Sequence, residues 1–289
     1  MTLGSQFALA AFPWSRLLRL PRPIDIVNWL RLFAISVMIS LSYLAARRAG
    51  EWLGPVDLTV ARYAIAACVL AVWRRLSARR GSLRPGRDLA WLIGLAACVS
   101  GYQVAFLAGL ELTEKASAAA VNALTPLIVA GLAVLMLGER LTLRGWLGLP
   151  TAVLGSMWIV SGGAPLAVLD SAGTGELLCL VAGTCWAFFM VGSRRLSGRL
   201  ADEALTVVVS VLCVVMLLPV LVASGDTGNR EAMDGWALAA VIYMGALPSG
   251  YAIVMLLRST REVGAVATST CVYGLTPLMV SAFDWMVQG

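Results

Sequence analysis

Residues 89–110 have the sequence LAWLIGLAACVSGYQVAFLAGL, an apolar run without a charged side chain. An α-helix of about 20 such residues crosses the hydrocarbon core of a bilayer. The whole chain has this character, because 60% of its 289 residues are hydrophobic, 13% are charged and the mean hydropathy is +0.84. Backbone groups in lipid must pair within their own segment, and the strand-like alternation of a β-barrel is absent from the sequence. We therefore predict an all-α polytopic membrane protein.

Apolar runs of the same kind, bounded by charged residues, predict nine membrane spans. Their expected limits are 29–46, 56–73, 89–110, 116–137, 143–162, 175–193, 204–223, 236–257 and 263–286. Residues 1–27 precede the first span. Their apolar stretch, 7–12, is short and comes before the arginines rather than after them, unlike a secretory signal peptide. We predict that residues 1–27 form a cytoplasmic N-terminal arm.

Three motifs occur twice in the same order along the chain. VNALTPL at 121–127 matches VYGLTPL at 272–278, SGY at 100–102 matches SGY at 249–251, and RR at 47–48 matches RR at 194–195. This order indicates an internal duplication, with units at 28–162 and 174–289. The first unit holds five spans, an odd number, so the second unit enters the membrane from the opposite side. The predicted architecture is an inverted repeat of five-helix units.

Basic residues give an independent prediction of orientation, because Lys and Arg concentrate on the cytoplasmic side of membrane proteins. If the N-terminus is inside, 17 of the 22 basic residues fall in cytoplasmic segments: Arg16, Arg19, Arg22, Arg31, Arg74, Arg75, Arg79, Arg80, Arg84, Arg87, Arg140, Arg144, Arg194, Arg195, Arg199, Arg258 and Arg261. These cytoplasmic arginines account for the net charge of +6. A basic loop between two spans is an orientation signal, so we expect no nucleic-acid partner.

The repeat pattern, with LTP at 124–126 and LGERL at 137–141 closing the first unit, resembles the EamA-type families of the drug/metabolite transporter superfamily. The likeness covers residues 28–289 and implies export of metabolites. Arg62 and Trp186 fall where the family has a recurrent Arg and a recurrent Trp. The family pattern has ten spans, and aligning Pro277 with Pro126 places Gly289 on Gly138. The expectation is therefore nine spans, with the second unit incomplete at its C-terminal end and the tenth span missing.

Several chemistries are excluded by residue types that the chain lacks. It has no histidine, and its one lysine, Lys115, is followed by Ala116, so neither a Walker A loop nor a His-based metal site or Ser-His-Asp triad can form. The six cysteines all lie within predicted spans and lack the spacing of a zinc site. We expect no enzyme activity, no cofactor and no metal.

Inverted-repeat transporters bind substrate near the bilayer midplane, where helices are interrupted. Pro126 and Pro277 each remove a backbone hydrogen bond, so we predict helix breaks at both positions, with freed carbonyls facing polar groups. The candidates for substrate contact lie around these breaks and on the duplicated SGY motif: Tyr102, Gln103, Asn122, Thr125, Ser249, Tyr251, Tyr273 and Thr276, with Trp186 and, as further options, Tyr43 and Trp158. For the Thr-Pro pairs, re-satisfying the broken helix is the alternative role, and for Asn122 it is bonding between helices.

Two further features of the predicted spans concern packing and ion coupling. Ala97, Gly101, Ala105 and Gly109 are spaced by four residues, which predicts a smooth ridge on which another helix packs closely. Most Asp and Glu residues lie at the ends of predicted spans or in loops, but Asp284 lies within a span. We interpret Asp284 either as a proton relay or as a group at the external interface.

We interpret the chain as a secondary transporter of a bacterial inner membrane that exports small amphipathic metabolites, such as amino acids or related compounds, by alternating access. Multidrug efflux is an alternative within the same class. A non-transporting scaffold, or a degenerate subunit that needs a partner helix, is the alternative from another class. The expected partners are a small-molecule substrate and the lipid bilayer, and a homodimer is compatible with the sequence.

The arginine distribution predicts that the N-terminus and the 74–88 loop are cytoplasmic and that Gly289 is external. Reporter fusions at these three places measure the orientation directly. An external N-terminus, or a cytoplasmic Gly289 in an inserted chain, would contradict the nine-span topology.

Overall fold

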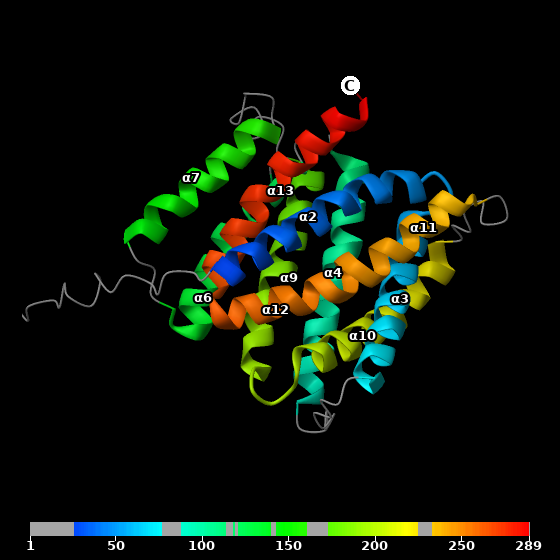
Figure 1. Cartoon of the computed structure of the whole chain (residues 1–289), viewed down its shortest axis with the longest axis horizontal. Coiled ribbons are helices and arrows are strands. Elements are labelled where there is room, and N and C mark those ends of the chain that lie inside the picture. The colour runs from blue at the N-terminus through cyan, green and yellow to red at the C-terminus, as the bar shows by residue number, and fades with distance from the viewer. Residues whose placement is uncertain are drawn as a thin grey trace, which may run out of the picture.

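The computed structural model describes residues 26–76, 88–113, 118, 121–139, 143–160, 173–224 and 233–288. Most of the predicted N-terminal arm, the arginines between 77 and 87, Lys115 and the side chain of Asp284 lie outside this description. Figure 1 shows the described part as a bundle of helices. Their bounds are α2 Ile26–Ala49, α3 Pro55–Leu76, α4 Leu89–Leu112, α6 Thr125–Leu137, α7 Leu143–Val160, α9 Thr174–Ser193, η1 Arg194–Leu196, α10 Asp202–Ser224, α11 Gly235–Met244, η3 Gly245–Ala252, α12 Ile253–Glu262 and α13 Ala265–Gln288.

Each predicted span overlaps a helix of the structure, which confirms the all-α membrane fold. Within the described residues, six segments are long and apolar enough to cross a membrane: 26–49, 55–76, 89–112, 174–196, 202–223 and 235–262. The last segment joins α11, η3 and α12 into one rod. Its middle part, η3, is a π-helix that contains Pro248. Proline lacks the N–H that an α-helix needs, and single π-helical turns are frequent at functional sites.

The packing of the helices follows an inverted repeat. The equivalent helices of the two units are α2 and α9, α3 and α10, α4 and the α11–η3–α12 rod, and α6 and α13. The main contacts between these helices of different units have equivalent contacts. The α4–α9 contact corresponds to the contact of the rod with α2, the α3–η3 contact to α10–α4, and the α13–α2 contact to α6–α9. The α3–α10 and α6–α13 contacts map onto themselves. The fifth helix of the first unit, α7, lies at the edge of the bundle against α13 and α6 (Figure 1).

The predicted ridge on α4 is confirmed at its two glycines, Gly101 and Gly109, which face α9, whereas Ala97 is exposed. A Cβ atom built on Gly109 would lie 2.7 Å from Sγ of Cys179 and 2.9 Å from the carbonyl oxygen of Gly175. On the facing helix, a Cβ atom on Gly175 would lie 2.8 Å from Cβ of Thr113. The two backbones can approach this closely only because both positions lack side chains.

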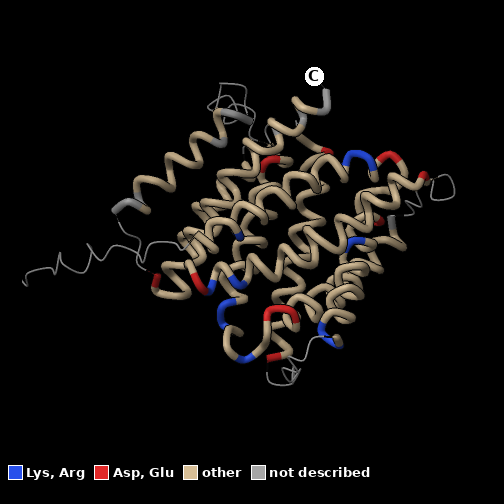
Figure 2. Tube along the Cα trace, in the orientation of Figure 1, with Lys and Arg blue, Asp and Glu red and all other residues tan. Residues whose placement is uncertain are grey.

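Charged residues gather at the two ends of the bundle, and few of them lie in the middle (Figure 2). One end, here called the arginine-rich end, carries the start of α2, the end of α3, the starts of α4 and α10, and the ends of α9 and α12. Its basic residues include Arg31, Arg74, Arg194, Arg258 and Arg261. The opposite end carries the α2–α3 connection, the end of α10 and the start of α11.

The glycine contact predicts that Gly109→Ala destabilises the protein, because the added methyl group overlaps α9. Overpacking of this kind costs about 1–3 kcal/mol. Gly94→Ala is the matched control on the same helix, since a Cβ atom there meets nothing within 4 Å. The measurement is the Tm of the purified protein in detergent. Equal Tm values for the two variants would contradict close packing of α4 on α9.

Candidate functional site

Arg62 is an exception to the confinement of charge to the ends. It lies seven residues into α3, or about 10 Å along a helix that is apolar enough to cross a membrane. Its Nε–H donates to Oγ of Ser249 on η3, 3.1 Å away, and Ser249 is buried. Gly245 permits this approach of η3 to α3, because a Cβ atom there would lie 2.5 Å from Cβ of Ile65. Among the described residues, no carboxylate forms an ion pair with Arg62.

Three tyrosines from three helices lie near this guanidinium group. Tyr43 on α2, Tyr63 on α3 and Tyr102 on α4 lie within electrostatic range of Arg62. Tyr273 on α13 lies within the same range of the other three hydroxyl groups. The side chain of Gln103 lies close to that of Tyr63. We call Tyr43, Arg62, Tyr63, Tyr102, Gln103, Trp186, Ser249 and Tyr273 the central cluster.

Trp186 on α9 connects the tyrosines of the two halves. Its Nε1–H donates to the hydroxyl of Tyr273, and its ring lies 5.3 Å from that of Tyr102. The aromatic series continues on both sides, since Phe106 stacks on Tyr102 at 5.7 Å and Phe189 lies 5.3 Å from Trp186. Rings at these separations attract one another beyond simple burial. The cluster therefore offers an aromatic wall beside a cation.

The side chains of the central cluster differ in exposure. Tyr43 lies two helical turns from the fully buried Ser36, on the same face of α2, and is 43% exposed. Arg62, Tyr102, Trp186 and Tyr273 are half-buried, and Tyr63, Gln103 and Ser249 are buried. The cluster therefore combines buried polar side chains with partly accessible aromatic and cationic ones.

The structure brings together six of the residues singled out from the sequence: Tyr43, Tyr102, Gln103, Trp186, Ser249 and Tyr273. Tyr251, the repeat partner of Tyr102, lies elsewhere. Its ring is 5.6 Å from that of Trp73, in a groove at the arginine-rich end. Trp158 is exposed on α7, at the edge of the bundle.

The Thr-Pro segments of the two repeats differ from each other. A turn at 123–124 precedes α6, so Pro126 lies in the first turn of a new helix, where a missing N–H is tolerated. In contrast, α13 continues through Pro277. Sequence symmetry predicted the same break at both positions, and this symmetry is absent from the backbone.

Local hydrogen bonds account for the polar groups beside both prolines. Oγ1 of Thr276 donates to the carbonyl of Val272 at 2.7 Å, and Oγ of Ser40 donates to the carbonyl of Thr276 at 3.3 Å. Near Pro126, Oγ1 of Thr125 donates to Oδ1 of Asn122 at 3.2 Å. These bonds agree with the alternative role of the Thr-Pro pairs, in which they satisfy the backbone beside the proline and do not contact substrate.

Sequence reasoning gave little weight to Arg62 and Tyr63, which form the cationic part of the cluster. Arg62 was noted only through a family resemblance, and Tyr63 was not singled out. A usable signal exists, since both lie inside the apolar run 56–73. A charge within a membrane-crossing segment indicates function by default.

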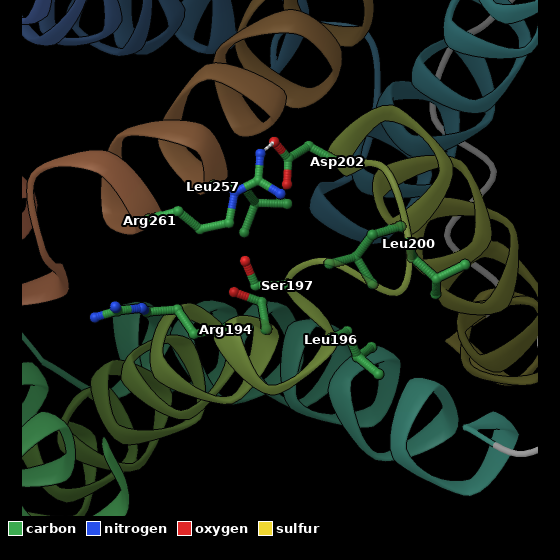
Figure 3. Close-up of a pocket in the computed structure, with 9 residues that line it drawn as sticks. Arg194, Leu196, Ser197, Leu200, Asp202, Leu257 and Arg261 are labelled. Carbon is green, nitrogen blue, oxygen red and sulfur yellow. Dashed lines mark hydrogen bonds and ion pairs between the residues drawn. The ribbon is translucent and has the colours of Figure 1, made fainter. Parts of the chain in front are cut away.

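Ion pairs join the two halves at the arginine-rich end. Arg194 pairs with Glu139, and Arg199 pairs with Asp88 at 2.9 Å. Figure 3 shows a narrow crevice beside them, where Arg261 of α12 binds Asp202 of α10 while the Arg194 side chain points away. These contacts join the ends of helices whose middle parts carry the central cluster.

The opposite end has its own contacts between the halves. Arg48 pairs with Asp234, and Thr113 donates to Glu176. The backbone N–H of Ala237, together with Arg48, holds the pKa of the Asp234 carboxyl below its ordinary value, so this carboxylate stays charged at neutral pH. Both ends are therefore held by polar contacts that water can replace when they separate.

The sequence profile of the EamA-like transporter family matches residues 28–161 and 173–289, in both halves of this architecture. The chain belongs to the EamA-like transporter family. This membership confirms the resemblance and makes the protein a multi-pass membrane transporter of small molecules, not an enzyme. The central cluster is thus part of an EamA-like transporter.

Known proteins agree with this membership. The chain is 21% identical over 263 residues to the uncharacterized transporter YyaM of Bacillus subtilis, covering 90% of this chain and 85% of that protein. It is 26% identical over 259 residues to a probable terminal-alkyne amino-acid exporter of Streptantibioticus cattleyicolor, covering 87% and 83%. A solved crystal structure superposes with a TM-score of 0.71 at 20% identity, covering 91% and 88% of the two chains, and shows the shared fold.

The different surroundings of Tyr102 and Tyr251 give a paired prediction for this EamA-like transporter. Tyr102→Phe should weaken substrate binding about two- to twelvefold, the effect of losing one hydrogen bond. Tyr251→Phe, its repeat partner in the groove, should leave substrate affinity unchanged. Binding to purified variants of normal abundance measures both. Equal effects, or no effect of Tyr102→Phe, would assign Tyr102 to packing.

Proposed function

We propose that this transporter exports small amphipathic metabolites that carry a carboxylate, amino acids or related compounds, through the central cluster. The observation that carries this proposal is Arg62, a cation at mid-bundle with a hydrogen bond to Ser249 but no described ion-pair partner. A planar guanidinium group matches a carboxylate through two parallel hydrogen bonds. An incoming carboxylate would supply the missing charge.

The aromatic side of the cluster suits the rest of such a substrate. Trp186 and Tyr102 present ring faces that can pack on an apolar side chain or attract an ammonium group. The hydroxyls of Tyr43 and Tyr273 can donate or accept hydrogen bonds. One relative is named as a probable amino-acid exporter, which agrees with this substrate class.

Alternating access would then separate the ion pairs at one end while those at the other end stay closed. The arginine-rich end is proposed to be cytoplasmic in a bacterial inner membrane, as the distribution of basic residues indicates. Substrate would enter from that end after the contacts of Arg194 and Arg199 separate. It would leave after the contacts of Arg48 and Glu176 separate.

The test is counterflow of radiolabelled amino acids through liposomes that contain the full chain, with Arg62→Gln and Arg75→Gln compared. Arg75 is the matched control, because it is an exposed arginine in the last turn of the same helix, α3, outside the central cluster. A hydrogen bond between charged groups contributes about 1.5–3 kcal/mol, so Arg62→Gln should lower apparent affinity roughly 10- to 150-fold. Arg75→Gln should transport as the wild type does.

Amino-acid methyl esters sharpen this test, because they lack the carboxylate. If the wild type transports them, the Arg62→Gln variant should transport them equally well. Flux of neutral or cationic drugs without amino-acid flux would favour multidrug efflux instead. Absence of any flux from the wild type would contradict the proposal and favour a scaffold role.

A further inference from the structure

A large groove lies at the arginine-rich end, apart from the central cluster. It has a volume of about 1100 Å³ and is lined by α2, α3, α10, η3 and α12. At the opposite end of the bundle, α11 contacts both α2 and α3. The residue Tyr251 of η3 faces the groove, whereas Ser249, two positions earlier, bonds to Arg62 of the central cluster. The groove is therefore a separate space on the other side of the π-helix.

The lining of the groove holds four arginines and three carboxylates and so has a net charge of +1: Arg31, Arg74, Arg258 and Arg261 against Asp202, Glu203 and Glu262. Glu262 accepts from two arginines at once, Arg31 at 2.5 Å and Arg258 at 2.8 Å. Two guanidinium groups sharing one carboxylate leave this trio with a net charge of +1. The Arg258 side chain is 52% exposed, and it bonds to Glu262 through Nε, so its terminal N–H groups can reach a further anion.

The wall of the groove is apolar and aromatic. Leu30 and Trp73 contribute exposed side chains from α2 and α3, and Met255 and Tyr251 contribute half-buried ones. The rings of Trp73 and Tyr251 are 5.6 Å apart. Tryptophan and tyrosine are typical of the layer where lipid headgroups meet acyl chains, which is the depth expected for the end of α3.

We propose that the groove binds one anionic phospholipid. Its phosphate lies at the Arg31–Glu262–Arg258 trio, and an acyl chain runs along Leu30, Trp73 and Tyr251. Basic pockets between membrane helices bind acidic lipid headgroups. A free phosphate would leave the apolar wall of the groove uncovered, which argues against it as the ligand. The bound lipid bridges α2 to α12 and rests on η3. Its binding therefore acts on the helix whose Ser249 is hydrogen-bonded to Arg62.

Native mass spectrometry of the full chain tests this proposal without any transport measurement. The protein is titrated with phosphatidylglycerol and with phosphatidylcholine of the same acyl chains. The wild type should prefer phosphatidylglycerol, and Arg258→Gln should weaken its binding about fivefold, the contribution of one basic residue near a charged lipid surface. Arg199→Gln, which removes an exposed arginine from the same end but outside the groove, should leave binding unchanged.

A second pair of variants tests the apolar wall. Trp73→Ala should weaken binding of phosphatidylglycerol, whereas Trp236→Ala, at an exposed tryptophan of the opposite end, should not. Glycerophosphoglycerol, the headgroup without acyl chains, should not displace the lipid. Equal binding of the two lipids, equal effects of Arg258→Gln and Arg199→Gln, or displacement by the free headgroup would each overturn the proposal.

Discussion

A positive charge in the middle of a membrane-crossing helix is the constraint on which the central part of this structure depends. A buried guanidinium group must be hydrogen-bonded, paired or hydrated, because its transfer into hydrocarbon is costly. Here Arg62 reaches Ser249, and it can do so because η3 is a π-helix with Gly245 against α3. The hydroxyl groups of Tyr43 and Tyr102 lie within electrostatic range of it. The irregular helix, the glycine and the tyrosines are therefore parts of one arrangement that keeps a cation in the bilayer.

The two halves share a packing plan but not its details, and the differences lie where a transporter must be asymmetric. Tyr102 packs on Trp186 in the centre, whereas its repeat partner Tyr251 packs on Trp73 in the groove. The α4–α9 contact is sealed by Gly109 and Gly175. The equivalent contact of α2 with the α11–η3–α12 rod adjoins an open groove at the arginine-rich end. In an inverted repeat, unequal conformations of equivalent helices are what make one face differ from the other.

Hydropathy and the repeated motifs were sufficient to predict the spans, the duplication and the small-residue face of α4, because each depends on local composition. The site was harder to predict. The span 89–110 is apolar on every side, so its sequence does not record which face turns inward, and Tyr102 could be chosen only through its repeat partner. That partner was misleading for Tyr251, since equivalent positions need not have equivalent surroundings. The π-helix depends on contacts between α3 and η3 that no single segment encodes.

The central claim is that the cluster around Arg62 lines a space that water and substrate can enter. The most direct test uses a cysteine-free background with Tyr43→Cys, at 43% exposure, or Val211→Cys, at 47% exposure on the face of α10 opposite the buried Val209 and Cys213. Both are treated in native membranes with a charged thiol reagent that reacts only in water. The account predicts that Tyr43→Cys is modified, that transported substrate protects it, and that Val211→Cys in lipid stays unmodified. No reaction at Tyr43→Cys in the folded protein, with full reaction after unfolding, would show that the cluster is dry packing and would contradict the account.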